Sequence, residues 1–181
     1  MKLLLDACVI YPTVMREMLL GVARSGGYEP LWSARIFEEW ALAVRKIGPD
    51  AEAQARGEIA MLGVAFPKAM VAPHPGLEAR LWLPDSNDIH VLAAAIAGSA
   101  DGIITLNAKD FPRGILADEG LSRNDPDAFL LGHWHAEPER VADVADGVMQ
   151  EARRLSGVDW TLRALMKKAR LPRLGKALSG A

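Results

Sequence analysis

The chain has 181 residues, of which 50% are hydrophobic and 24% are charged, and its formal net charge is −2. A chain of this length and composition can bury a sizeable core, so we expect a soluble globular protein. Its single cysteine, Cys8, excludes an internal disulfide, and no apolar run approaches the roughly 18 residues that a membrane span needs. Because no signal-peptide pattern is present either, we expect a cytoplasmic protein that does not associate with membranes.

The charge is distributed unevenly along the chain. Residues 1–150 contain 13 basic and 21 acidic side chains, whereas residues 151–181 contain 8 basic and 2 acidic ones. An acidic body suits the binding of cations, and a basic tail suits contact with a polyanion or an acidic partner.

The amino-terminal part alternates short apolar runs with helical patterns. Residues 2–5 predict a strand that leads directly into Asp6. The carboxyl end of a first strand is where open α/β sheets bind ligands, but an aspartate that only caps the next helix is the simpler interpretation. Further along, the pattern predicts strands over 28–32 and 69–72 and helices over 13–24, 34–46 and 50–64.

The helix predicted for residues 34–46 carries an acid at the border of its apolar face. At 3.6 residues per turn, Phe37 and Trp40 lie on that face, Glu39 lies at its border and Glu38 points nearly opposite. We therefore expect Glu39 to reach a site at the edge of the core and Glu38 to be a solvated surface charge.

The middle of the chain places polar side chains at both ends of a helix–strand unit. Residues 89–97 predict a helix preceded by capping oxygens, and residues 102–105 predict a strand buried on both faces that ends in a polar turn. We therefore expect Asp85 or Asp88 to meet Asp110 at one edge of the sheet.

Acidic and amide side chains thus gather where predicted strands end. Carboxylates from distant parts of a chain repel one another, so placing them together costs stability unless a divalent cation neutralises them. Oxygen ligands favour Mg²⁺ or Mn²⁺, whereas zinc and copper prefer nitrogen or sulfur. Such a cluster suits metal-assisted hydrolysis of a phosphodiester, although each acid alone could equally be a helix cap. The separated acids are Asp6, Glu39, Asp85 or Asp88, and Asp110, with Asn107 beside the last.

Beyond Pro112 the pattern is helical throughout, and Pro172 is expected to end the last helix. His133 and His135 do not share a helix face and have no third ligand at suitable spacing, so they do not indicate a zinc site. The predicted helices span 114–119, 127–134, 137–155 and 159–170.

Four stretches of the chain form an ordered set of motifs: Leu5–Val9, Ser33–Glu39, Leu83–Ala95 and Ile103–Pro112. Together they resemble the PIN domain, and most closely the VapC-like ribonuclease toxins of bacterial toxin–antitoxin systems. The resemblance covers about residues 1–115, and the helices after 125 are similar to the tail of some members. It implies an α/β fold related to the flap-endonuclease core, with a central parallel sheet flanked by helices. The implied domains are a PIN-like nuclease domain (1–124) and a helical C-terminal extension (125–181).

The activity implied by this resemblance is endonucleolytic cleavage of RNA that depends on Mg²⁺ or Mn²⁺. Carried over residue by residue, the acids of the family match Asp6, Glu39 and Asp110, and Asn107 matches a position that is Asp or Asn. Thr105 and Asn107 would orient ligands or the scissile phosphate. The implied metal ligands are Asp6, Glu39, Asp85, Asp88, Asn107 and Asp110.

The third acid differs from the pattern of the family. Members often have Asp-Pro-Asp-Asp before this helix, whereas this chain has Asp85-Ser-Asn-Asp88, so that one acid of the run is Asn87. We prefer Asp88 as the catalytic acid, with Asp85 as a second ligand or its replacement. Cys8 stands where many members have Asn, which removes a polar side chain near the site.

The resemblance also implies partners. These are an RNA substrate, a cognate antitoxin that blocks the acidic pocket with an Arg or Lys, and a second copy of the chain in a homodimer, to which helix 13–24 could contribute. The phosphates of RNA should lie along basic side chains, for which the candidates are Lys109, Arg113, Arg163, Lys167, Lys168, Arg170, Arg173 and Lys176. Two alternatives stay open: a non-catalytic PIN-like module that binds RNA or protein, and a metal-dependent nuclease acting on DNA.

Overall fold

The computed structural model describes residues 1–180, apart from the side chain of Pro49, and its contacts divide the chain into two compact units. The first unit comprises Met1–Tyr11 and Glu29–Arg123, and the second comprises Pro12–Tyr28 and the chain from Asn124 onward. The helix Thr13–Arg24 is thus grouped with the C-terminal helices. The division into domains 1–124 and 125–181 stays a prediction.

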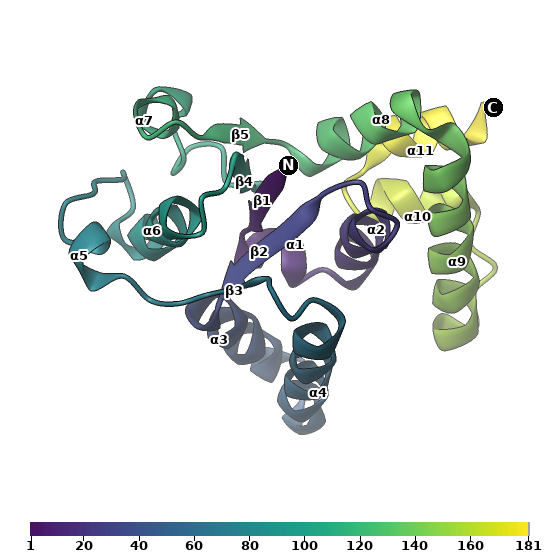
Figure 1. The fold of residues 1–181 in the computed structure, drawn as a ribbon. Coiled ribbons are helices and arrows are strands. Elements are labelled where there is room, and N and C mark those ends of the chain that lie inside the picture. Colours follow the sequence, from purple (N-terminus) through teal and green to yellow (C-terminus); the bar gives the residue numbers. More distant parts are fainter. Residues whose placement is uncertain (181) are drawn as a thin grey trace. The chain divides into compact units, whose positions relative to one another are not determined.

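The first unit is built on a five-stranded sheet in the order β3-β2-β1-β4-β5 (Figure 1). Strand β1 pairs in parallel with β2 and β4, and β2 pairs in parallel with β3. Every residue of β4 is buried, as are the last three residues of β1, as expected for a parallel sheet covered on both faces. The predicted central parallel sheet is therefore confirmed. The strands are β1 (Lys2–Leu5), β2 (Glu29–Ser33), β3 (Met70–Val71), β4 (Gly102–Ile104) and β5 (Ser122–Asn124).

Helices cover both faces of this sheet, because right-handed crossovers that run in opposite directions along the sheet pass over opposite faces. Helix α6 (Ile89–Ala97) packs across β1, β2 and β4, and Figure 1 shows α1 (Ala7–Ile10) on the other side of the sheet. Helix α3 packs against α1, α4 and β2. The remaining helices of the unit are α3 (Ala34–Ala43), η1 (Val44–Lys46), α4 (Pro49–Ala65), α5 (Pro75–Glu78), η2 (Ser86–Asp88) and α7 (Arg113–Asp118).

The second unit is helical. Helix α2 (Thr13–Arg24) packs against α8 (Pro126–Ala136) and α9 (Pro138–Ser156). A Cβ on Gly21 would lie 2.3 Å from Cγ1 of Val144, so the close approach of α2 to α9 requires a glycine at this position. The large apolar side chains of α2 are buried, except for the half-buried Val14. A homodimer contact would therefore need a surface other than this apolar face.

The chain beyond Pro112 contains two elements that the sequence pattern did not predict. Strand β5 is polar and lies at the edge of the sheet, so it lacks the apolar run by which buried strands are recognised. Helix α10 (Leu162–Lys168) ends before Pro172, and Pro172 begins α11 (Pro172–Ser179). The expectation that Pro172 ends the last helix is thus wrong, because proline also suits the first turn, where its missing N–H is not needed. None of the described helices is both long and apolar enough to cross a membrane.

Asp127 links the last helix to α8. Its side chain is 5% exposed, and its two oxygens accept hydrogen bonds from the backbone N–H groups of Arg173 and Leu174, both at 2.9 Å. These N–H groups lie in the first turn of α11, where no carbonyl of the same helix is available to accept them. The carboxylate therefore fixes the start of α11 on α8.

Replacing Asp127 by Ala should lower the free energy of unfolding by about 1–3 kcal/mol, because one buried and one partly buried N–H group lose their acceptor. The measurement is urea unfolding followed by circular dichroism. Asp143→Ala, which removes an exposed acid from α9 of the same unit, is the matched control. Equal stability of the two variants would show that these hydrogen bonds do not hold α11 in place.

Candidate functional site

The first predicted acid lies at the carboxyl end of the two central strands. Leu5 pairs with Ile104, so Asp6 and Thr105 leave adjacent strands side by side. Thr105 Oγ1 donates a 2.7 Å hydrogen bond to Asp6 Oδ2, and the Asp6 side chain makes no capping hydrogen bond to the helix that follows. The simpler interpretation of Asp6 as a helix cap is therefore wrong, because its carboxylate is turned to the end of the sheet.

Cys8 is a polar partner of this carboxylate. Its thiol donates to Asp6 Oδ2 at 3.0 Å, and its sulfur accepts a hydrogen bond from the backbone N–H of Leu106 at 3.3 Å. Burial, together with the negative charge of Asp6, raises the pKa of the thiol to about 12, so it stays protonated and able to donate. The sulfur thus supplies polar contacts at the position where the sequence suggested that a polar side chain is missing.

The loop after β4 carries Asp110 and is held by Arg123 of β5. Nη1 of Arg123 donates to the carbonyl oxygens of Ala108 at 2.6 Å and Phe111 at 2.9 Å, one on each side of Asp110 in the chain. The buried ring of Phe111 anchors the same loop in the core. This role of Arg123 was not predicted, because the sequence pattern did not indicate β5.

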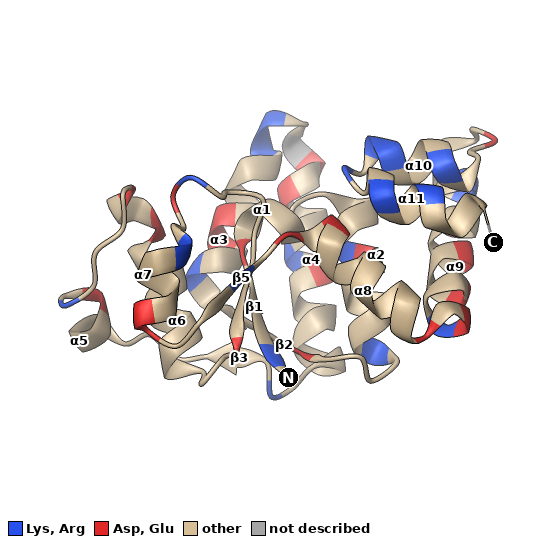
Figure 2. Ribbon diagram, turned by 90° about the horizontal axis from the view of Figure 1, so that it is seen from above, with Lys and Arg blue, Asp and Glu red and all other residues tan. Residues whose placement is uncertain are grey.

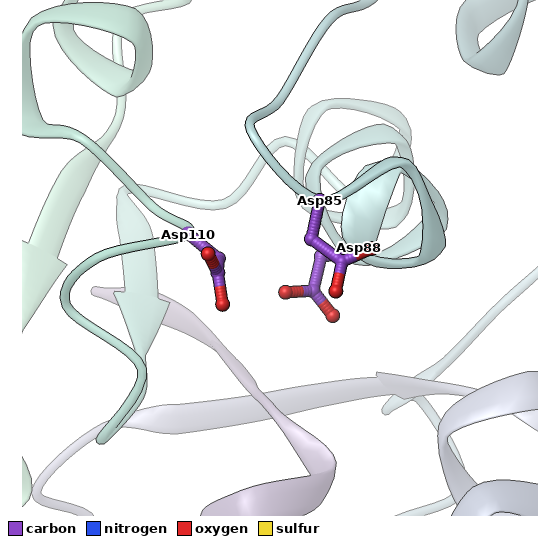
Figure 3. Close-up of side chains that lie close together, drawn as sticks. All are labelled: Asp85, Asp88 and Asp110. Atoms are coloured by element: carbon purple, nitrogen blue, oxygen red, sulfur yellow. The ribbon is translucent and has the colours of Figure 1, made fainter.

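Three carboxylates from two segments face one another at this edge. Figure 3 shows Asp110 opposite Asp85 and Asp88, and one oxygen of each residue lies within 4.8 Å of the other two. All three side chains are half-buried. Among the described residues, this is the group of His, Cys, Asp and Glu whose spacing suits a metal ion. The prediction that Asp85 or Asp88 lies close to Asp110 is therefore confirmed.

Amide side chains orient two of these acids. Asn107 Nδ2 donates to Asp88 Oδ2 at 3.1 Å, and the backbone N–H of Asn107 donates to Thr105 Oγ1 at 2.9 Å. Asp85 Oδ1 accepts from both the backbone and the side-chain amide of Asn87, at 2.9 and 3.0 Å. Asn87, which stands where the family often has an acid, therefore holds Asp85 in place without adding a charge.

Asp88 lies where the fields of the other acids converge. Partial burial, followed by the negative charges of Asp6, Asp85, Asp110 and Glu39 in that order, raises its pKa to about 6. The ionised form of Asp88 is thus less stable than that of an ordinary carboxylate, and a divalent cation among these oxygens would stabilise it. An all-oxygen donor set of this kind fits Mg²⁺ or Mn²⁺.

Glu39 lies beside basic side chains rather than within the three-carboxylate group. His90 Nε2 is 2.8 Å from Glu39 Oε1, but neither ring nitrogen of this buried histidine makes a well-directed hydrogen bond with the described residues. The exposed Arg35 lies 3.6 Å from the same oxygen and also donates to the carbonyl of Asn87 at 3.4 Å. Sequence reasoning missed both partners, although His90 is the only polar residue of the apolar run 89–97 and was a visible signal.

Replacing Asp88 by Asn should stabilise the metal-free protein near neutral pH. The pKa of Asp88 is about 6 in the folded protein and 3.8 ordinarily, so protonation of Asp88 stabilises the fold. This contribution to stability is fully present below pH 3.8 and is lost as the pH rises through 6. Thermal unfolding in EDTA should show that the advantage of Asp88→Asn over the wild type grows across this window. Asp118→Asn, at an exposed acid of α7, should show no such trend. An advantage that does not change with pH would contradict the repulsion argument.

Comparison with known proteins agrees with this geometry. The family model of the PIN domain matches residues 2–109, which is more than half of the chain. The match spans β1 to β4 and the acids Asp6, Glu39, Asp85 and Asp88, and it ends one residue before Asp110. Neither the curated proteins nor the solved structures gave a significant match. The parallel sheet, the acids at its carboxyl edge and the matched family model together show that this chain belongs to the PIN-domain family.

Proposed function

We propose that the protein is a metal-dependent endoribonuclease that hydrolyses RNA phosphodiester bonds and acts in the cytoplasm as the toxin of a toxin–antitoxin pair. PIN domains are generally metal-dependent nucleases, and the acidic group of this chain suits a divalent metal. The observation that carries the proposal is the position of Asp88, whose carboxylate feels four other acids and whose ionisation a cation would favour.

In this proposal Asp85, Asp88 and Asp110 hold Mg²⁺ or Mn²⁺ directly or through water, together with Asp6. When bound, the metal would supply positive charge for activating a water and for neutralising the charge that builds on the phosphate. Asn107 orients Asp88 through its amide, and Thr105 orients Asp6 through its hydroxyl.

Glu39 has a separate role at the rim of the site. Its side chain is 39% exposed, so it can reach a second cation or the attacking water, and His90 limits how far its carboxylate can move. Lys109 and Arg113 are exposed near Asp110 in the sequence and are candidates for contact with the substrate phosphates. The Arg35 guanidinium beside Glu39 can take up the same kind of contact.

The catalytic assignment predicts that several acids act as one unit. Asp6→Asn, Glu39→Gln and Asp110→Asn should each reduce Mg²⁺- or Mn²⁺-dependent cleavage of single-stranded RNA by roughly a hundredfold or more, because each removes charge that stabilises the transition state. The fold should persist in each variant, as judged by circular dichroism, and Asp118→Asn should cleave like the wild type. Near-normal cleavage by Asp6→Asn would remove the basis of the assignment. Cleavage of DNA but not RNA of the same sequence would identify a DNA nuclease.

A paired comparison distinguishes Asp85 from Asp88 as the third acid. We expect Asp88→Asn to be inactive and Asp85→Asn to retain part of the rate with weaker metal affinity, because the charges of Asp6, Asp85, Asp110 and Glu39 all act on Asp88. Cleavage rates titrated with Mn²⁺ measure both effects. An inactive Asp85→Asn beside an active Asp88→Asn would exchange the two roles.

The toxin role predicts growth arrest that depends on the acidic site. Induced expression of the wild type should stop growth, and the Asp110→Asn variant should not. Co-expression of the small protein encoded by a neighbouring gene should restore growth and yield a complex on size exclusion, because a basic side chain can replace the cation in the acidic pocket. The elution volume in the same size-exclusion experiment would show whether the protein forms a homodimer. Arrest by both forms of the protein, or no protection by the neighbour, would count against a toxin.

A further inference from the structure

The last two helices form an outward-facing cationic surface. Six basic side chains between Thr161 and Gly180 are all exposed, and this segment contains no acid. Figure 2 shows the blue of Lys and Arg along both α10 and α11. We call these residues the α10–α11 surface: Arg163, Lys167, Lys168, Arg170, Arg173 and Lys176.

Packing explains why these charges face the solvent. The apolar side chains Leu165, Met166, Leu171 and Leu174 are buried, and α10 and α11 pack against each other. A Cβ on Gly175 would lie 2.7 Å from Cβ of Met166, so the two helices approach closely and leave the basic residues on the outer side.

Most of this positive charge is not compensated within the described chain. Several exposed arginines elsewhere pair with acids, as Arg56 does with Glu38 at 2.9 Å and Arg80 with Glu119 at 2.7 Å. On the α10–α11 surface, Lys168 lies over the ring of Trp160 and Arg173 lies 3.6 Å from Asp127. The other four cations have no acidic partner among residues 1–180. Each is therefore repelled by the neighbouring positive charges without a compensating attraction. These four are Arg163, Lys167, Arg170 and Lys176.

The backbone conformation of Arg170 is a second, independent indication that this surface contacts a ligand. This residue follows α10 with φ 63, in the left-handed region that glycine adopts at lower cost. An arginine here carries a conformational cost that a glycine would avoid. A contact made by its side chain would offset that cost.

We propose that the α10–α11 surface binds the phosphate backbone of the nucleic acid that the protein cleaves. This inference rests on the proposed nuclease function: the acidic site repels a polyanion, so affinity for the substrate needs positive charge elsewhere in the chain. No large exposed hydrophobic side chain lies between Thr161 and Gly180, so the surface lacks the apolar centre of a protein interface. Uncompensated charge without apolar area is what sequence-independent phosphate binding requires.

The test is equilibrium binding of a fluorescent single-stranded RNA to the full chain in EDTA, where cleavage is absent, over a range of salt concentrations. The variant is Lys167→Gln with Arg170→Gln, and the matched control is Lys46→Gln with Lys68→Gln, which removes two exposed lysines of the first unit. Losing two phosphate contacts should lower the log–log salt slope by about 1.4 and weaken binding at about 0.1 M salt by roughly tenfold or more. The control should keep the slope of the wild type.

An unchanged slope and affinity in the α10–α11 variant would overturn the inference, as would equal losses in variant and control. Binding of a polyglutamate peptide provides a further comparison. If the variant lost affinity for this peptide but not for RNA, the inference would also be overturned, since the surface would then recognise an acidic protein. The cleavage rate at a saturating RNA concentration distinguishes failure of this inference from failure of the proposed function. The variant should cleave at the wild-type rate once saturated, whereas failure of the wild type to cleave at all would overturn the nuclease proposal and leave the binding result standing.

Discussion

The mutual repulsion of carboxylates at one edge of a parallel sheet is the constraint on which this structure depends. Asp85, Asp88 and Asp110 bring their oxygens within 4.8 Å of one another, and Asp6 and Glu39 add to the same field. In a flexible chain these groups would move apart, since like charges at this distance oppose each other's ionisation. The fold must hold them together by interactions that do not involve the charges themselves.

The buried strands and a few neutral hydrogen bonds provide that hold. The pairing of Leu5 with Ile104 sets Asp6 next to Thr105, and the hydroxyl and thiol that donate to Asp6 carry no charge at neutral pH. The Asp110 loop is fixed through backbone carbonyls by Arg123, so that the carboxylate itself stays free for a ligand. These contacts hold the acids in place in the cation-free protein, an organisation that electrostatic catalysis in the proposed nuclease would require.

The acidic group and the α10–α11 surface pose opposite problems of charge. The acids need a cation, whereas the uncompensated arginines and lysines need an anion. In the proposed nuclease, a divalent cation held by the carboxylates and a polyanionic substrate on the basic surface would resolve both problems in one complex.

The sequence by itself determined the central parallel sheet, the α2, α6 and α9 helices and the set of candidate acids, because apolar period and chain order are local properties of the residues. Polar edge strand β5 and helix α11 were missed, since a short edge strand has no apolar run and a proline can begin a helix as well as end one. Only the tertiary structure decided which side chains accompany the acids. Cys8, Asn87, His90 and Arg123 act through contacts between segments or through the geometry of a turn, and hydrophobic periodicity carries no information on side-chain direction at the end of a strand. The sequence could place acids at the edge of a sheet, but their distances, partners and pKa shifts depend on strand register and burial, which exist only in the folded chain.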